Sequence, residues 1–227
     1  MKKYLLAIAA MGAALTASAQ SDIFDNPDNH DYFGARISLD VSSTAGGNDT
    51  YSNGAGFNIG AIYNIPLYKN LYLEPGLSIF YDTFGEDIIV NDPADIQMPY
   101  TIDGSIRNFG FRIPLVAGYH FDFTDDVQIS FFTGPQFNLS LTAKEHISGD
   151  SESIFGDGGF KHVDLQWALG VGATWQKYYV AISGGIGMTK VRDHKVTYFD
   201  PDIHTNILTY QDSFRRNTFS ITLGYNF

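Results

Sequence analysis

The 227-residue chain is long enough for one domain or one barrel, and its formal net charge of −11 gives it no electrostatic footprint for nucleic acid. It has no cysteine, which excludes disulfides, thiolate metal sites, a cysteine nucleophile and a lipid anchor on an N-terminal cysteine. No apolar stretch reaches the roughly 18 residues that a membrane-spanning helix needs. The 18 Phe, 14 Tyr and 23 Gly residues favour strands instead.

The first residues have the organisation of a secretory signal peptide. Lys2 and Lys3 precede an apolar run over residues 4–15, and Ala17-Ser18-Ala19 supplies the small residues that signal peptidase requires. The alternative, a buried N-terminal helix, does not account for this site. We therefore expect export, with a signal peptide over residues 1–19 cleaved after Ala19 and a short periplasmic tail over residues 20–31.

From about residue 32 onward the hydrophobic pattern has a period of two, which predicts β-strands with one apolar and one polar face. Eight segments show it, in chain order residues 33–41, 57–65, 71–81, 109–121, 127–141, 163–175, 180–188 and 219–227. Each segment suffices for a tilted membrane strand of about 9–11 residues. Four prolines interrupt or border these segments, and we expect local bulges there: Pro66, Pro75, Pro114 and Pro135.

Short and long connections alternate along the chain. The short ones are residues 66–70, 122–126 and 176–177, and the long ones are about residues 42–55, 83–105, 142–161 and 190–213. Tight periplasmic turns and long outer loops are typical of an outer-membrane barrel. We therefore predict an all-β fold, an eight-stranded antiparallel up-and-down transmembrane β-barrel over residues 32–227, with both chain ends at the periplasmic end and mobile outer loops.

The alternation alone does not distinguish a membrane barrel from a soluble lipocalin-like barrel, whose apolar face points inward. The lysines decide between them, because they fall in turns or near loop bases rather than inside strands: Lys69, Lys144, Lys161, Lys177, Lys190 and Lys195. We predict that the polar face lines a narrow, plugged lumen. Aromatic residues beside the short turns are expected to meet lipid headgroups: Tyr63, Tyr119, Phe121, Trp175 and Tyr225.

Charged side chains on the polar face form a predicted lumen network: Arg36, Asp40, Glu74, Asp82, Arg112 and Asp164. Because an isolated buried charge is costly, we expect the two arginines to pair with carboxylates. The favoured interpretation is a structural network that fills the barrel. A gated polar path for protons or small ions is the alternative.

We predict no catalytic, cofactor-binding or metal-binding residues and no cofactor. A lipid-modifying enzyme would need a histidine with a serine and a carboxylate at the membrane–loop boundary. The candidates are His146, His162 and Asp164, or Asp193, His194, His204 and Ser213, with His120 at the opposite end. No spacing among them fixes a triad. Acidic loop residues match no calcium-loop spacing and are interpreted as solvated: Glu86, Asp87, Asp92, Asp95, Asp103, Glu145, Asp150, Glu152 and Asp157.

The C-terminus carries alternating hydrophobic residues that end on an aromatic side chain: Phe219, Ile221, Leu223, Tyr225 and Phe227. This pattern resembles the insertion signal of outer-membrane barrels. The resemblance implies that the barrel-assembly machinery recognises the chain during insertion.

Several short motifs lie along the chain: GAIYNIPL at residues 60–67, LEPGL at 73–77, RIPL at 112–115, Gly134-Pro135 and Gly170-x-Gly172. With them, residues 32 to 227 resemble the outer-membrane β-barrel family of Bacteroidota, called PorT-like, among the small OmpA/OmpX-type eight-stranded barrels. The resemblance implies a barrel in the outer membrane of a Gram-negative bacterium but specifies no activity.

The expected function is non-enzymatic, a surface, structural or interaction role through long extracellular loops. The alternatives are an accessory component of a type IX-like secretion or transport complex, and a lipid-modifying enzyme. The expected partners are outer-membrane lipid, the barrel-assembly machinery during insertion and an unidentified protein, with no nucleic acid.

Overall fold

The structure is a computed structural model that describes residues 31–46, 51–90, 100–124, 126–147, 150–156, 159–200 and 205–227. The predicted signal peptide and residues 20–30 of the predicted tail lie outside the described residues, as do Asp92, Asp95, Asp157 and His204.

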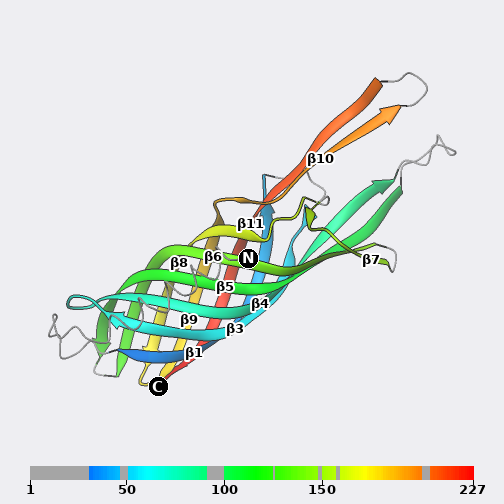
Figure 1. Cartoon of the computed structure of the whole chain (residues 1–227). Coiled ribbons are helices and arrows are strands. Elements are labelled where there is room, and N and C mark those ends of the chain that lie inside the picture. The colour runs from blue at the N-terminus through cyan, green and yellow to red at the C-terminus, as the bar shows by residue number, and fades with distance from the viewer. Residues whose placement is uncertain are drawn as a thin grey trace.

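The described chain forms eleven strands: β1 (Tyr32–Ala45), β2 (Tyr51–Ser52), β3 (Gly54–Pro66), β4 (Leu71–Val90), β5 (Tyr100–Thr124), β6 (Val127–Ile147), β7 (Asp150–Ser153), β8 (Val163–Trp175), β9 (Tyr178–Gly187), β10 (Lys190–Asp200) and β11 (Thr205–Asn226). Eight of them pair antiparallel in the order β1-β3-β4-β5-β6-β8-β9-β11, and the β1–β11 pairing closes the ring (Figure 1). The predicted eight-stranded antiparallel barrel is confirmed, and each alternating segment falls in one of these eight strands, except for Met188 and Phe227, which follow the last residues of β9 and β11. The short strands β2 and β7 pair with β4 and β6, and β10 pairs with β11.

The ring closes because the first and last strands match along most of their length. Their register runs without a shift from Gly34 opposite Asn226 to Ala45 opposite Arg215. A closed ring leaves no barrel strand with an unpaired edge in the hydrocarbon layer. Both β1 and β11 therefore begin or end at the same end of the barrel, where the short turns also lie.

The two faces of each strand have opposite chemistry, and the apolar face points outward. In β1, Leu39 is 70% exposed, whereas the neighbouring Asp40 is 2% exposed. The reverse of a soluble protein, with apolar side chains exposed and polar side chains buried, is found around the ring. In β6, for example, Phe131 is exposed and the neighbouring Ser130 is buried. The outward band is the surface that lipid covers, and the polar face lines the lumen as predicted.

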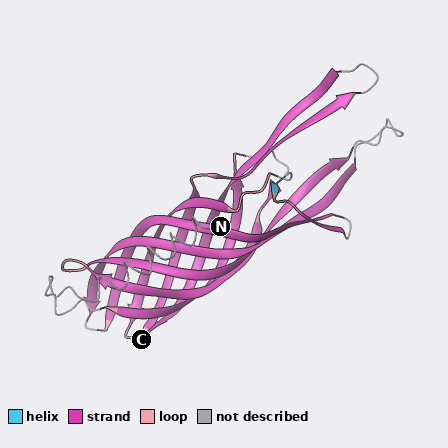
Figure 2. Cartoon of the chain, in the orientation of Figure 1, coloured by secondary structure: helices cyan, strands magenta, loops and turns pink. Residues whose placement is uncertain are grey.

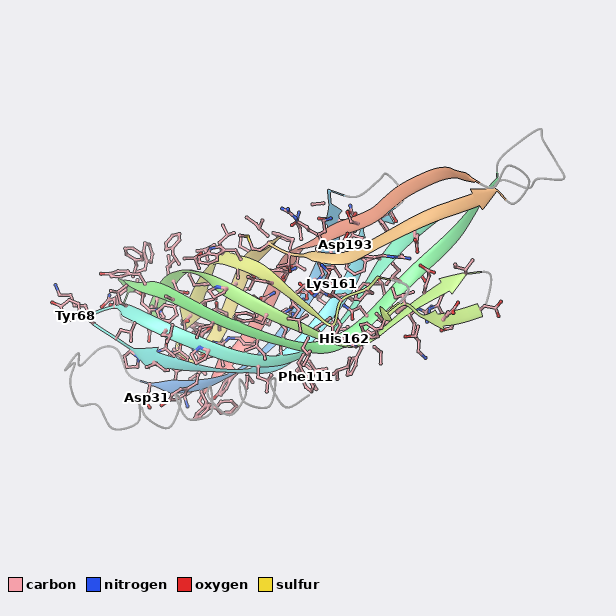
Figure 3. All side chains as sticks on the ribbon, turned by 45° about the horizontal axis from the view of Figure 1, so that its top comes forward. Asp31, Tyr68, Phe111, Lys161, His162 and Asp193 are labelled. Atoms are coloured by element: carbon pink, nitrogen blue, oxygen red, sulfur yellow. The ribbon has the colours of Figure 1, made fainter. Side chains whose placement is uncertain are left out.

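Aromatic side chains gather at the short-turn end of this band. The rings of Trp175 and Tyr178 lie 6.1 Å apart between centroids, those of Tyr178 and Tyr225 5.6 Å, and those of Tyr225 and Phe227 5.2 Å. Figure 3 places Tyr68 and Asp31 toward this end and Lys161 and Asp193 far from it. In a barrel of this topology the short-turn end is periplasmic and the other end is extracellular.

The predicted outer loops are wrong in their extent, because much of them is β-ribbon. The β4–β5 pairing continues from Thr83 opposite Arg107 as far as Val90 opposite Tyr100, and β10 pairs with β11 as far as Asp200 opposite Thr205. Figures 1 and 2 show both ribbons projecting beyond the barrel. Two antiparallel strands can satisfy their hydrogen bonds with each other alone, so each hairpin continues beyond the height at which the ring ends.

The predicted bulges at the prolines are wrong as well. Pro75 lies opposite Leu115 and Ser78 opposite Arg112, so the β4–β5 register is unchanged across the interruption. A proline lacks the backbone N–H and removes a ladder bond without inserting a residue. The register shifts of the β5–β6 pair lie elsewhere, at Phe109/Gly110 and Asp122/Thr124.

Candidate functional site in the barrel lumen

Five charged side chains from five strands form an ion network in the extracellular half of the lumen: Asp40 of β1, Asp82 of β4, Arg112 of β5, Asp164 of β8 and Arg216 of β11. Arg112 Nη1 lies 2.6 Å from Asp40 Oδ2, and its Nη2 lies 3.6 Å from Asp82 Oδ2. Arg216 Nη1 lies 2.8 Å from Asp82 Oδ2, while its Nη2 pairs with Asp164. The two guanidinium groups thus alternate with three carboxylates, and all five side chains are buried.

Amide side chains and one ring extend the network. Asn58 Nδ2 donates to Asp40 Oδ2 at 2.9 Å. Arg112 Nε donates to Asn138 Oδ1 at 3.1 Å, and Asn138 Nδ2 donates to Asp164 Oδ1 at 2.9 Å. The ring centroid of Phe80 lies 5.3 Å from the Arg112 guanidinium carbon and 5.0 Å from that of Arg216. Buried charges with this many partners fix the strands relative to one another.

The structure brings four of the six predicted lumen residues into this network, namely Asp40, Asp82, Arg112 and Asp164. Arg216 was missed by the sequence analysis, because it lies between the predicted outer loop and the last alternating segment. Continuing the alternation backwards from Phe219 would have placed Arg216 on the lumen face. In residues 214–220 of β11 the even-numbered side chains point into the lumen, as the buried Thr218 and Ser220 show.

Arg36 and Glu74 lie apart from the network, in a chamber nearer the periplasmic end. The chamber is a cavity of about 110 Å³, lined also by Ser38, Gln136 and Tyr179. The Arg36 guanidinium carbon lies 4.1 Å from the centroid of the Tyr179 ring, and Nη1 donates to the backbone oxygen of Ala35 at 3.1 Å. No ion pair within 4.0 Å joins Arg36 to a carboxylate in the described chain.

Two glycines make room for the Arg36 side chain. A Cβ atom built on Gly34 would meet Arg36 Nη1, and one built on Gly224 would come within 2.6 Å of Arg36 Cδ. The Arg36 side chain therefore lies against β1 and β11 at two positions that carry no side chain, Gly34 and Gly224.

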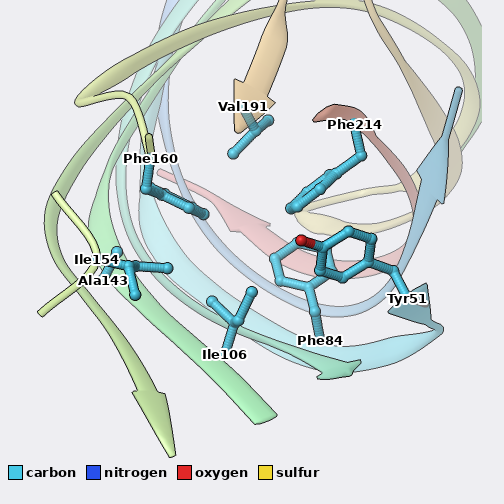
Figure 4. Close-up of a cluster of buried hydrophobic side chains, with 8 residues drawn as sticks. All are labelled: Tyr51, Phe84, Ile106, Ala143, Ile154, Phe160, Val191 and Phe214. Carbon is cyan, nitrogen blue, oxygen red and sulfur yellow. The ribbon is translucent and has the colours of Figure 1, made fainter. Parts of the chain in front are cut away.

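An apolar cap of eight buried side chains closes the extracellular end of the lumen: Tyr51, Phe84, Ile106, Ala143, Ile154, Phe160, Val191 and Phe214 (Figure 4). The rings of Tyr51 and Phe214 lie 4.5 Å apart between centroids. The cap was missed by the sequence analysis, because most of its members lie in segments assigned to outer loops. Each of these segments contributes only one to three cap residues, which is too few to predict a buried face without the pairing of the ribbons.

A second charged group lies beside the cap and ties its strands together. Arg192 Nη1 donates to Tyr51 Oη at 3.0 Å, to Glu86 Oε1 at 3.2 Å and to Glu145 Oε1 at 3.1 Å. Two acidic residues that were interpreted as solvated, Glu86 and Glu145, are thus paired with an arginine. The prediction of solvated side chains is wrong for these two.

The histidines considered for catalysis do not meet a serine and a carboxylate in the described residues. His162 stacks on Phe155 with centroids 3.9 Å apart, while Asp164 belongs to the ion network. His120 stacks on Tyr72 at 4.0 Å.

The remaining candidates are no better placed. His146 of β6 lies opposite Ser105 of β5 and Ser151 of β7. Asp193 and Ser213 face each other across β10 and β11, but Lys190 donates to the Asp193 carboxylate at 3.2 Å. Only the backbone of His194 lies within the described structure.

The predicted insertion signal lies on the outward face of β11, with Phe219, Ile221, Leu223, Tyr225 and Phe227 all directed to the lipid side and exposed. Two larger hollows lie on the outer wall and at the periplasmic mouth of the barrel. An apolar one of about 730 Å³ lies on the lipid-facing wall and includes Phe131, Leu169 and Ile182. A polar one of about 680 Å³ lies at the periplasmic turns and includes Asp126 and Lys177.

Similar solved structures are outer-membrane proteins of low sequence identity. The attachment invasion locus protein Ail of Yersinia pestis is 14% identical, with 87% of this chain and 97% of that chain covered and a TM-score of 0.36. Neisserial surface protein A is 13% identical, with coverages of 87% and 97% and a TM-score of 0.41. The outer membrane protease OmpT of Escherichia coli is 14% identical, with coverages of 89% and 98% and a TM-score of 0.34.

A comparison with curated proteins found no match. Among the described residues, no helix is long and apolar enough to cross a membrane, and no group of three or more potential ligands is arranged to hold a metal ion. The model of the outer membrane protein beta-barrel domain family matches residues 29–189, which is more than half of the chain. The protein therefore belongs to the outer membrane protein β-barrel domain family and lies in the outer membrane.

Proposed function

We propose that this protein is a non-enzymatic component of the outer membrane that binds its partner through the two extracellular ribbons. The observation that carries the proposal is the continuation of β4–β5 and β10–β11 far beyond the ring (Figure 2). Ribbons of this length are not needed to cross the membrane, for which about 9–11 residues per strand suffice. They present backbone and side chains to the cell exterior on a rigid base.

The lumen supports this proposal because its contents obstruct transport. The ion network joins five strands across the lumen, and the apolar cap lies beyond it. An eight-stranded barrel has room for little more than its own side chains. Among the catalytic candidates that the structure describes, Asp164 is bound in the ion network and His162 stacks on Phe155, which favours a role without catalysis.

The ribbons can be removed without touching the cap. Glu86 and Gly104 are opposite each other in β4 and β5, so residues 87–103 can be replaced by an Asn-Gly turn. Asp193 and Ser213 allow the same replacement of residues 194–212. Both truncated barrels should still shift in gel mobility on boiling, which reports a folded barrel.

The test is complementation of a strain that lacks the protein. The truncated barrels should reach the outer membrane but fail to restore surface phenotypes, such as attachment of cells to each other or to a substratum. Full restoration by the doubly truncated barrel would contradict the proposal.

A second candidate function is an accessory role in a secretion or transport complex of the type IX kind. The polar hollow of about 680 Å³ at the periplasmic turns favours it, because it presents both charges to the periplasm. The paired substitutions Asp126→Lys and Lys177→Glu would disturb the hollow while preserving net charge. If these block secretion of exported proteins while the ribbon truncations do not, the second candidate replaces the first.

Two narrower assignments accompany the proposal. The motifs at residues 60–67 and 112–115 support a PorT-like barrel of Bacteroidota. The Ala17-Ser18-Ala19 sequence supports cleavage after Ala19 by signal peptidase. N-terminal sequencing of the mature protein tests the cleavage, with Gln20 expected as the first residue.

A further inference from the structure

Five basic side chains form an outward-facing row around the extracellular rim of the barrel, which we name the basic collar: Arg107, Lys144, Lys161, Lys190 and Arg215. Arg107, Lys144, Lys161 and Arg215 are exposed, and the Lys190 side chain is 38% exposed. The four buried arginines in the lumen and at the cap point the other way. The collar is therefore separate from the ion network and from the cap.

The collar lies directly above the apolar band. Arg107 is two residues beyond the outward Phe109, Lys161 two residues beyond Val163, and Lys190 two residues beyond Met188. Outward residues repeat every second position, with about 3.3 Å of rise per residue. Arg107, Lys161 and Lys190 thus stand one outward position above the last exposed apolar side chain of the band, and Arg215 stands two positions above Phe219, which is headgroup height at the outer leaflet.

Two pairs within the collar place like charges opposite each other. Arg107 lies opposite Lys144 across β5 and β6, and Lys190 lies opposite Arg215 across β10 and β11. Directly opposed residues have Cβ atoms about 4.5–5.5 Å apart, and like charges at that separation destabilise a sheet. An anion between them removes the repulsion.

The chain itself supplies such an anion on one side of the collar only. Asp193 lies 3.2 Å from Lys190 Nζ and 3.9 Å from Lys161 Nζ, and Figure 3 shows Asp193 and Lys161 near each other. For Arg107, Lys144 and Arg215, no carboxylate lies within 4.0 Å in the part of the chain that the structure describes. The Arg107–Lys144 pair is consequently the part of the collar most in need of an external anion.

The periplasmic rim differs in composition. Its two basic residues, Lys69 and Lys177, lie among three acidic ones, Asp31, Asp122 and Asp126, whereas the five basic residues of the collar have one carboxylate partner in the described structure, Asp193. General attraction of a barrel to lipid would not concentrate basic residues at the extracellular rim alone. A ligand restricted to the outer leaflet would produce this difference between the two rims.

We infer that the basic collar binds the phosphate groups of the phosphorylated glycolipid that forms the outer leaflet. Arginine and lysine are the side chains that bind phosphate oxygens by charge-assisted hydrogen bonds. Clustered basic side chains at headgroup height add to one another in recognising anionic lipid. The Arg107–Lys144 pair is assigned to one phosphate, and Arg215 with Lys190 to a second position on the rim.

The test compares lipid A carrying its phosphates with the same lipid A after phosphatase treatment, using the purified full-length barrel in neutral detergent. Native mass spectrometry counts the bound lipid. The wild-type barrel should bind the phosphorylated form at least about tenfold more tightly. The double variant Arg107→Gln with Lys144→Gln should lose most of this preference, and Arg107→Lys with Lys144→Arg should keep it.

The matched control is Lys69→Gln with Lys177→Gln at the periplasmic rim, which removes the same charge and should keep the preference. All variants are first checked for the gel shift on boiling. Equal binding of the two lipid forms by wild type, or equal losses in the collar and control variants, would overturn the inference. Competition by inorganic phosphate at the same concentration as the lipid would overturn the glycolipid as the occupant.

Discussion

The ion network and the chamber occupy the same lumen, yet they treat their arginines differently. Arg112 and Arg216 each bind two carboxylates. Arg36 lies over a tyrosine ring beside a cavity of about 110 Å³, and Glu74 lines the same cavity without pairing with it. The charged groups of the network contact one another directly, whereas those of the chamber are separated by the cavity.

This difference separates two uses of a buried charge. In the network, each arginine compensates carboxylates from other strands, so removing one leaves uncompensated charge in a closed interior. In the chamber, Arg36 makes no ion pair with a carboxylate, so its removal breaks a ring contact and a backbone hydrogen bond. The network should therefore carry much more of the folding free energy than the chamber.

The largest effect is expected from Arg216→Gln. This substitution leaves Asp82 and Asp164 buried without their shared cation and should lower the free energy of unfolding by about 3–5 kcal/mol. Urea unfolding in lipid vesicles, followed by the fluorescence of Trp167 and Trp175, measures the change. A loss below about 1 kcal/mol would show that the network does not hold the strands together.

A somewhat smaller effect is expected from Phe84→Ala in the apolar cap. Truncation of a fully buried phenylalanine should cost about 3 kcal/mol, because the cap loses packing against Phe214 and cannot collapse completely. Phe84→Leu is the matched control, with a cost below about 1.5 kcal/mol. Equal losses for the two variants in the same unfolding assay would mean that the cap is not closely packed.

The smallest effect is expected from Arg36→Gln in the chamber. The loss of the contact with Tyr179 should cost about 1 kcal/mol. The informative quantity is the difference between the losses in unfolding free energy of Arg36→Gln and Arg216→Gln under identical conditions. If Arg36→Gln is as costly as Arg216→Gln, the two regions are equivalent and the distinction between them fails.

The sequence predicts the ring of the barrel well because lipid imposes one requirement on every strand. Alternation of residues such as Leu39 and Asp40 over about 9–11 positions identifies the strand and separates its apolar face from its polar face, and the lysines outside the strands assign the polar face to the lumen. The same requirement ends at the headgroups. Beyond that height lipid no longer requires polar and apolar residues to alternate. The sequences around Val90 and Asp200 therefore resemble those of loops, although both segments pair as ribbons.

The missed site residues follow from the same boundary. Phe214 and Arg216 lie on the lumen face just above the last clear alternation, and Arg215 between them belongs to the collar. Three consecutive residues thus serve the cap, the collar and the network. Only the pairing of β11 with β1 and β10 shows which way each of them points.

The closed lumen is the central claim, and planar-bilayer conductance tests it most directly. The purified barrel should insert without producing a steady current under an applied potential. Removing the cap and one arginine together, by Tyr51→Ala, Phe84→Ala, Phe214→Ala and Arg216→Gln, should produce a measurable conductance if the barrel remains folded. A steady ion current through the wild-type barrel would contradict the account.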